Sequence, residues 1–153
     1  MPLECNKANM TALVVALESG HYEQAEGLLR GDPDGEEPGG YCCVGVACDI
    51  SGQGRWMKSD QDEWNYVTTE GYSPTTAPPP VVEWLGLKKV ASDLLADLAA
   101  LPLSPFETGW GNGETVTSYH HGTTLNDDGE TFAQIARRIR ETYLDEPQAG
   151  ETP

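Results

Sequence analysis

Hydrophobic residues recur at helical spacing near both ends of the chain. In the segment 9–18 they stand three and four positions apart, which predicts a helix that Asn9 caps. The segment 131–144 has the same periodicity and begins with Thr131 and Gln134, the pair of a capping box. The expected buried faces are Met10, Leu13, Val14 and Leu17 in the first helix, and Phe132, Ile135, Ala136, Ile139 and Tyr143 in the second.

The middle of the chain has shorter apolar segments. The segment 41–50 is continuously apolar, which fits a buried strand or a buried helix; its small residues favour a short helix. The segments 55–57 and 64–69 predict a β-hairpin, since the second alternates and has β-favouring residues. A helical turn is expected over 81–85 and a longer helix over 88–101.

Turn-forming residues separate these elements. The segment 21–30 is polar and is a candidate strand, and 31–40 is an acidic loop. Prolines in 73–80 predict an extended connector. The glycine-rich stretch 106–124 predicts irregular structure, in which 116–119 is a candidate edge strand.

Together these elements predict one compact α+β domain over residues 9–145, with three or four helices packed on a small antiparallel sheet. The length of 153 residues suits a single hydrophobic core. Residues 1–8 are expected to form a flexible N-terminus and residues 146–153 a disordered tail.

The charge excludes several classes of function. With 25 acidic and 9 basic residues, the net charge is −16, which argues against direct nucleic-acid binding and against adsorption to anionic membranes. No apolar run approaches the roughly 20 residues needed to cross a bilayer. No signal peptide is recognisable, so we expect a cytoplasmic protein.

Cysteine and histidine are the residues with the most obvious chemistry. The cysteines are Cys5, Cys42, Cys43 and Cys48. Their spacing does not match a zinc knuckle, and adjacent His120 and His121 point to opposite faces of an extended segment. We therefore expect buried, reduced thiols and neither a metal site nor a cofactor. If the protein is an enzyme, the catalytic candidates are Cys42, His120 and His121.

The cluster 126–130 contains several oxygen ligands and one glycine. It lacks the residue order of a calcium loop. We expect instead an Asx-turn in which Asn126 or Asp127 accepts from nearby backbone amides and leads into the C-terminal helix.

Two surface features are candidate binding sites. Trp110 stands in a glycine-rich stretch, where an aromatic residue is a common interface anchor. Carboxylates of the acidic loop could bind a basic protein. The candidate binding residues are Trp110, Asn112, Glu114, Asp34, Glu36 and Glu37.

Three sequence blocks, at 41–49, 82–87 and 125–136, occur in this order. Together they resemble a family of small, uncharacterised accessory proteins of actinobacterial phages and prophages. The resemblance implies an accessory role in phage infection. It implies no catalytic residue.

These observations support three hypotheses. The first is a non-enzymatic phage accessory protein that binds a host or defence-system protein in the host cytoplasm through acidic loops. The second is a small-molecule binder that sequesters a nucleotide signal, for which Trp110, Arg137, Arg138 and Arg140 are the available aromatic and cationic groups. The third is a Cys/His-dependent enzyme or a zinc protein.

Overall fold

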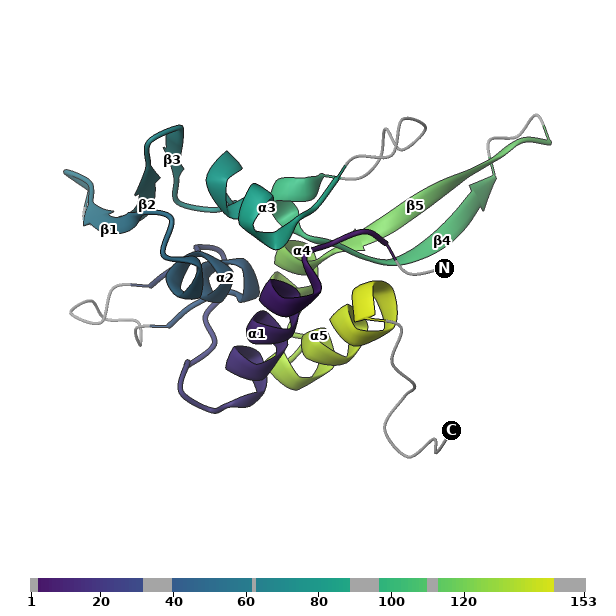
Figure 1. The fold of residues 1–153 in the computed structure, drawn as a ribbon, viewed down its shortest axis with the longest axis horizontal. Helices are drawn as coiled ribbons and strands as arrows, with labels where there is room; N and C mark the ends of the chain where they lie inside the picture. Colours follow the sequence, from purple (N-terminus) through teal and green to yellow (C-terminus); the bar gives the residue numbers. More distant parts are fainter. Residues whose placement is uncertain (1–2, 32–39, 62, 89–96, 110–112, 145–153) are drawn as a thin grey trace.

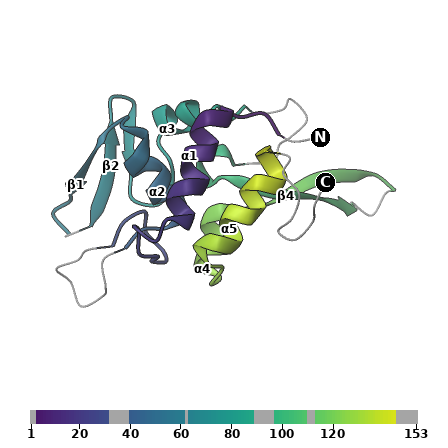
Figure 2. The ribbon, with the colours of Figure 1, turned by 60° about the horizontal axis from the view of Figure 1, so that its bottom comes forward.

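The computed structural model describes residues 3–31, 40–61, 63–88, 97–109 and 113–144. This part of the chain contains five α-helices and two small antiparallel sheets, so the predicted α+β class is confirmed. The prediction of one sheet is wrong: the two sheets lie at opposite ends of the molecule, with the helices between them (Figures 1 and 2).

The N-terminal helix α1 (Lys7–Glu18) packs beside the C-terminal helix α5 (Phe132–Ile139), which continues as a π-helical turn, η2 (Arg140–Leu144). All residues predicted for the two apolar faces are buried. Helix α1 begins before the predicted start because Asn6, and not Asn9, is its N-cap: the Asn6 side chain accepts from the Asn9 amide at 3.0 Å.

The described segment before α1, residues 3–6, contacts the rest of the domain. The amide of Leu3 donates to the Thr142 carbonyl, and the amide of Asn6 donates to the Leu85 carbonyl, both at 2.8 Å. Leu3 and Cys5 also pack against the core.

The apolar segment at 41–50 forms the predicted helix, α2 (Cys43–Ser51), and its small residues explain the choice over a strand. At Gly45 an added Cβ would lie 1.8 Å from the Leu29 carbonyl oxygen, so only glycine permits this close approach. The helix is buried along nearly its whole length.

The predicted hairpin is confirmed. Strands β1 (Arg55–Lys58), β2 (Trp64–Thr68) and β3 (Gly71–Ser73) form an antiparallel sheet with β2 in the centre. The predicted strand at 21–30 is wrong: with the described residues this segment forms isolated bridges, both to Tyr41, because turn-forming residues interrupt it.

Helix α3 (Pro79–Leu85) confirms the predicted helical turn, and Gly86 caps it in the left-handed conformation. The helix predicted over 88–101 lies partly outside the described residues. Its described end is a 3₁₀ turn, η1 (Leu98–Ala100), and Leu101 has φ 64°, so a helix through Leu101 is wrong.

The glycine-rich stretch is more regular than predicted. Strands β4 (Pro102–Gly109) and β5 (Thr115–His121) form an antiparallel ribbon that extends from the helices (Figure 1). The short helix α4 (Gly122–Asp127) follows, so an irregular 106–124 is wrong, whereas the edge strand at 116–119 is confirmed. In the described residues no helix is long and apolar enough to span a bilayer.

Candidate functional site

Aromatic and basic side chains gather on one face of the β1–β2–β3 sheet. Trp56 pairs with Tyr66, and Lys58 pairs with Trp64. Antiparallel partners share a face, so these four side chains point to the same side of the sheet. We call the set Arg30, Tyr41, Trp56, Lys58 and Trp64 the Arg30 cluster.

The guanidinium group of Arg30 lies over three aromatic rings. Its Cζ atom is 4.2 Å from the centroid of the Trp64 ring and 5.6 Å from those of Tyr41 and Trp56. Lys58 Nζ lies 5.4 Å from the same Trp64 ring. Two of the nine basic residues of a strongly acidic protein therefore meet at one indole.

Arg30 differs from Arg138 and Arg140, each of which forms an ion pair with a glutamate. Within the described residues, no carboxylate lies at ion-pair distance from it. Stacking on rings occupies the faces of a guanidinium group, whereas its N–H donors point outward in the plane. Among the described residues the Arg30 side chain has no hydrogen-bond acceptor, so its N–H donors are available to another group.

A chain of edge-to-face aromatic contacts fixes the cluster to the domain. Ring centroids are 5.0 Å apart for Tyr22 and Tyr41, 5.9 Å for Tyr41 and Trp56, and 5.0 Å for Trp56 and Tyr66. Tyr66 is buried, and its hydroxyl accepts from the Gly54 amide at 2.7 Å. The Arg30 cluster thus rests on a packed, hydrogen-bonded base.

The acid beside the aromatic chain, Asp49, is already engaged. Its two oxygens accept from the Tyr22 hydroxyl at 2.5 Å and from Trp56 Nε1 at 2.9 Å. Burial, together with this hydrogen bond to Asp49, raises the pKa of Tyr22. Asp49 therefore orients the aromatic rings and forms no ion pair with Arg30.

Trp64 differs from Trp56 in one respect. The Nε1 atom of Trp64 is buried and has no hydrogen-bond partner among the residues that the structure describes. A buried donor without an acceptor is rare and costs about 1–3 kcal/mol.

The same cluster forms the base of the acidic loop. The Gly31 amide donates to the Gly40 carbonyl at 2.6 Å, and Arg30 and Tyr41 form an isolated bridge beside it. The two ends of the loop therefore meet at the Arg30 cluster. The predicted binding residues Asp34, Glu36 and Glu37 lie outside the described residues.

The second predicted binding feature is at the other end of the molecule. Trp110 and Asn112 lie outside the described residues, and exposed Glu114 stands directly before β5. Since the two sheets lie at opposite ends (Figures 1 and 2), the structure does not bring Glu114 near the Arg30 cluster. The ribbon also exposes Phe106, whose ring lies 4.8 Å from that of His120.

The thiols do not have the environment of a nucleophile. Cys42, Cys43 and Cys48 are buried, and Cys42 is the N-cap of α2. Burial raises the pKa of the Cys42 thiol to about 11 and raises the pKa values of Cys43 and Cys48 as well. A reactive cysteine needs a lowered pKa.

The histidines are not assembled with the thiols into a metal site. His121 Nε2 accepts from the Asp97 amide at 3.0 Å, and burial lowers the pKa of this imidazole. His120 is exposed on β5. Across the described ranges, no group of three His, Cys, Asp or Glu side chains could hold a metal ion.

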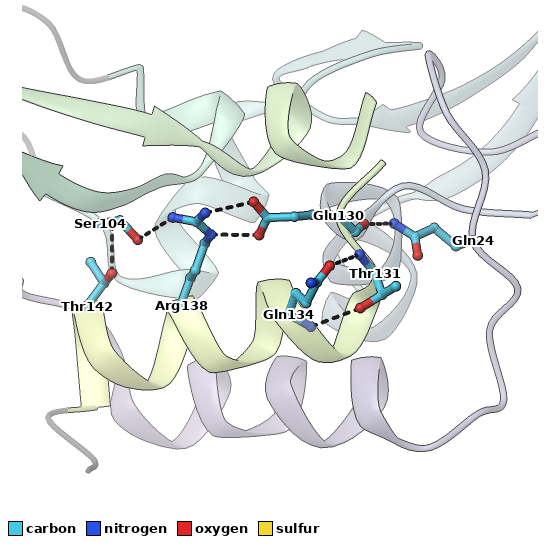
Figure 3. A network of polar contacts seen from close by, with 7 residues as sticks. All are labelled: Gln24, Ser104, Glu130, Thr131, Gln134, Arg138 and Thr142. Carbon is cyan, nitrogen blue, oxygen red and sulfur yellow. Dashed lines mark hydrogen bonds and ion pairs between the residues drawn. The ribbon is translucent and has the colours of Figure 1, made fainter. Parts of the chain in front are cut away.

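In the C-terminal helix, Arg138 holds neighbouring elements together (Figure 3). Arg138 makes a bidentate ion pair with Glu130, at 2.6 and 2.7 Å, and donates to Ser104 Oγ at 3.0 Å. Arg140 pairs with Glu18 at 2.5 Å, and Arg137 is exposed. These three arginines were the cations expected to bind a nucleotide. The basic side chains that lie over aromatic rings are instead Arg30 and Lys58.

The expected Asx-turn at 126–130 is wrong because its side chains make long-range bonds. Buried Asn126 accepts from Gln24 Nε2 at 2.9 Å and donates to the Ala25 carbonyl at 2.7 Å. Asp127 accepts from the Gly27 amide at 2.7 Å. These contacts attach the segment 24–27 to α4.

Sequence reasoning missed the Arg30 cluster, although two signals for it were present. Lys58 and Trp56 alternate in one strand, and Trp64 and Tyr66 alternate in the next, which places all four on one face of a hairpin. Arg30 and Tyr41 flank the acidic loop. Their meeting over Trp64 depends on tertiary packing.

Comparisons with known proteins give a family and no activity. Neither the curated proteins nor the solved structures include a match to this chain. One family model matches residues 7–143, which span α1 to η2. The chain belongs to the family described as a domain of unknown function, DUF8296.

Proposed function

We propose that the protein is a non-enzymatic binding protein whose acidic loop, residues 31–40, engages a positively charged surface of a protein partner. The observation that carries this proposal is the anchored loop base. Arg30 and Tyr41 hold the two ends of the loop together on a packed aromatic base. A fixed base limits the conformational entropy that a loop loses on binding.

The loop concentrates charge at one place. Its carboxylates are Asp32, Asp34, Glu36 and Glu37, and it contains no lysine or arginine. Such a surface increases the rate of encounter with a basic partner and disfavours acidic ones. The raised thiol pKa values make the Cys/His enzyme less favourable, so binding is the better proposal.

The biological setting of this proposal is phage infection. The resemblance of the blocks 41–49, 82–87 and 125–136 to actinobacteriophage accessory proteins supports it. We propose that the partner is a host or defence-system protein and that the two meet in the host cytoplasm.

The test is quantitative capture of host proteins by three forms of the full chain. The loop variant is Asp34→Asn, Glu36→Gln and Glu37→Gln. The matched control, Asp145→Asn, Glu146→Gln and Glu151→Gln, removes the same charges from the C-terminal segment. A specific partner should be captured by the wild type and the control and be lost from the loop variant. Equal capture by all three would refute the proposal.

A further inference from the structure

The Arg30 cluster presents donors for a ligand that differs from the partner of the acidic loop. We propose that Arg30, together with the indole N–H of Trp64, binds an oxyanion group, phosphate or carboxylate, of a small molecule. This inference goes beyond the proposed function, because its ligand is negatively charged.

The first argument is the state of the guanidinium group. Arg30 is half-buried, its Cζ atom lies over aromatic rings, and no described carboxylate neutralises it. In contrast, Arg138 uses its in-plane donors in a bidentate pair with Glu130. Planar guanidinium donors match the two oxygens of a carboxylate or phosphate group.

The second argument is the indole of Trp64. Its buried Nε1 has no acceptor in the described part of the chain, whereas the equivalent atom of Trp56 is bonded to Asp49. Arg30 and Lys58 both lie over this one ring. We infer that a ligand oxygen held by Arg30 is the missing acceptor.

The third argument is the charge around the site. A protein of net charge −16 has a large excess of carboxylates, yet none in the described part of the chain lies at ion-pair distance from Arg30. Asp49 would be the natural neutralising group, yet both of its oxygens accept from aromatic side chains.

The experiment follows the indole N–H signals of the full-length protein by two-dimensional NMR. The Trp64→Phe variant assigns the Trp64 signal. Sodium phosphate, adenosine monophosphate and sodium acetate are titrated separately at constant ionic strength, with sodium chloride as reference. We expect a saturable shift of the Trp64 signal. A response to phosphate and the nucleotide alone would identify a phosphate site, and a response to acetate as well would identify a general oxyanion site.

Substitutions of two arginines test the site: Arg30 is the proposed ligand-binding residue, and Arg55 is the control. Arg55 lies in β1 beside Trp56, on the opposite face of the sheet, so Arg55→Gln should change the apparent Kd less than twofold. Arg30→Gln should weaken binding at least tenfold. Because this variant could unfold, Arg30→Lys keeps the charge and removes the planar fork, and should weaken binding about threefold to tenfold.

The outcomes separate this inference from the proposed function. A Trp64 signal that never saturates, or that responds equally to sodium chloride, would overturn the oxyanion site. An unchanged Kd in both Arg30 variants would do the same. The loop variant, Asp34→Asn, Glu36→Gln and Glu37→Gln, should bind the anion more tightly, because repulsion falls, while it loses the basic partner.

Discussion

At the scale of single residues, burial determines the chemistry of the cysteines. The pKa of Cys42 is raised above its value in the unfolded chain, about 8.5, to about 11. The unfolded chain therefore loses the Cys42 thiol proton at a lower pH than the folded protein does. The contribution of this thiol to the free energy of unfolding is complete below about pH 8.5 and is lost as the pH rises through about 11. We expect the melting temperature to fall over this range, and to fall less steeply in Cys42→Ser, measured by circular dichroism. Identical slopes would contradict this assignment.

The same burial predicts the order of thiol labelling. Cys5 is half-buried, whereas Cys42, Cys43 and Cys48 are buried. In native protein at pH 8, Cys5 should react with a maleimide first, and the other three should react only at the rate of opening. Mass spectrometry of the labelled peptides measures this order. Rapid labelling of all four would show that α2 is not packed as described.

A buried polar residue also has a predictable cost. Asn126 is fully buried and bonds Gln24 and Ala25 through both ends of its amide. Asn126→Ala should destabilise the protein by about 2–4 kcal/mol, since two partners lose their bonds. Exposed Asp128→Ala is the control and should change the free energy of unfolding by less than about 0.5 kcal/mol. Urea denaturation that gave equal values for both would refute the network.

At the scale of elements, the capping box and the apolar stripe of α5 are separable. Thr131 Oγ1 accepts from the Gln134 amide at 3.2 Å, so Thr131→Ala should cost about 1 kcal/mol. Phe132 is a buried core residue, and Phe132→Ala should cost about 3–5 kcal/mol.

Trp110→Ala should leave stability almost unchanged if Trp110 is a binding anchor. Thermal melts of the three variants measure the order; a Trp110→Ala melt as low as that of Phe132→Ala would assign Trp110 to the core.

Some elements could be predicted from local pattern, and others could not. The capping box, the α1 stripe and the first hairpin depend on nearby residues, and all three are present. Of the β4–β5 ribbon only the strand at 116–119 was predicted, because the glycines of this stretch favour loops and the pairing depends on strands that meet across a turn. Asn126 and Asp127 were misassigned because their partners stand about 100 residues away in the chain.

At the scale of the whole molecule, the acidic loop could be predicted from the sequence, whereas the Arg30 cluster could not. The acidic loop is visible in composition, since a run of carboxylates lacks any cation. The Arg30 cluster required the sheet register and the return of Tyr41 beside Arg30. Tertiary packing, which unites residues 30, 41, 56, 58 and 64, therefore supplied the part of the site that no local pattern contains.

The central claim is that the acidic loop attracts its partner electrostatically. The most direct measurement is the association rate with the captured partner at about 0.05 M and 0.5 M salt, where the Debye length falls from about 14 Å to about 4 Å. The wild type and the C-terminal control should both associate at least tenfold more slowly at high salt, whereas the loop variant should be slow at both. A wild-type rate independent of salt, or a loop variant as fast as the wild type at low salt, would contradict the claim.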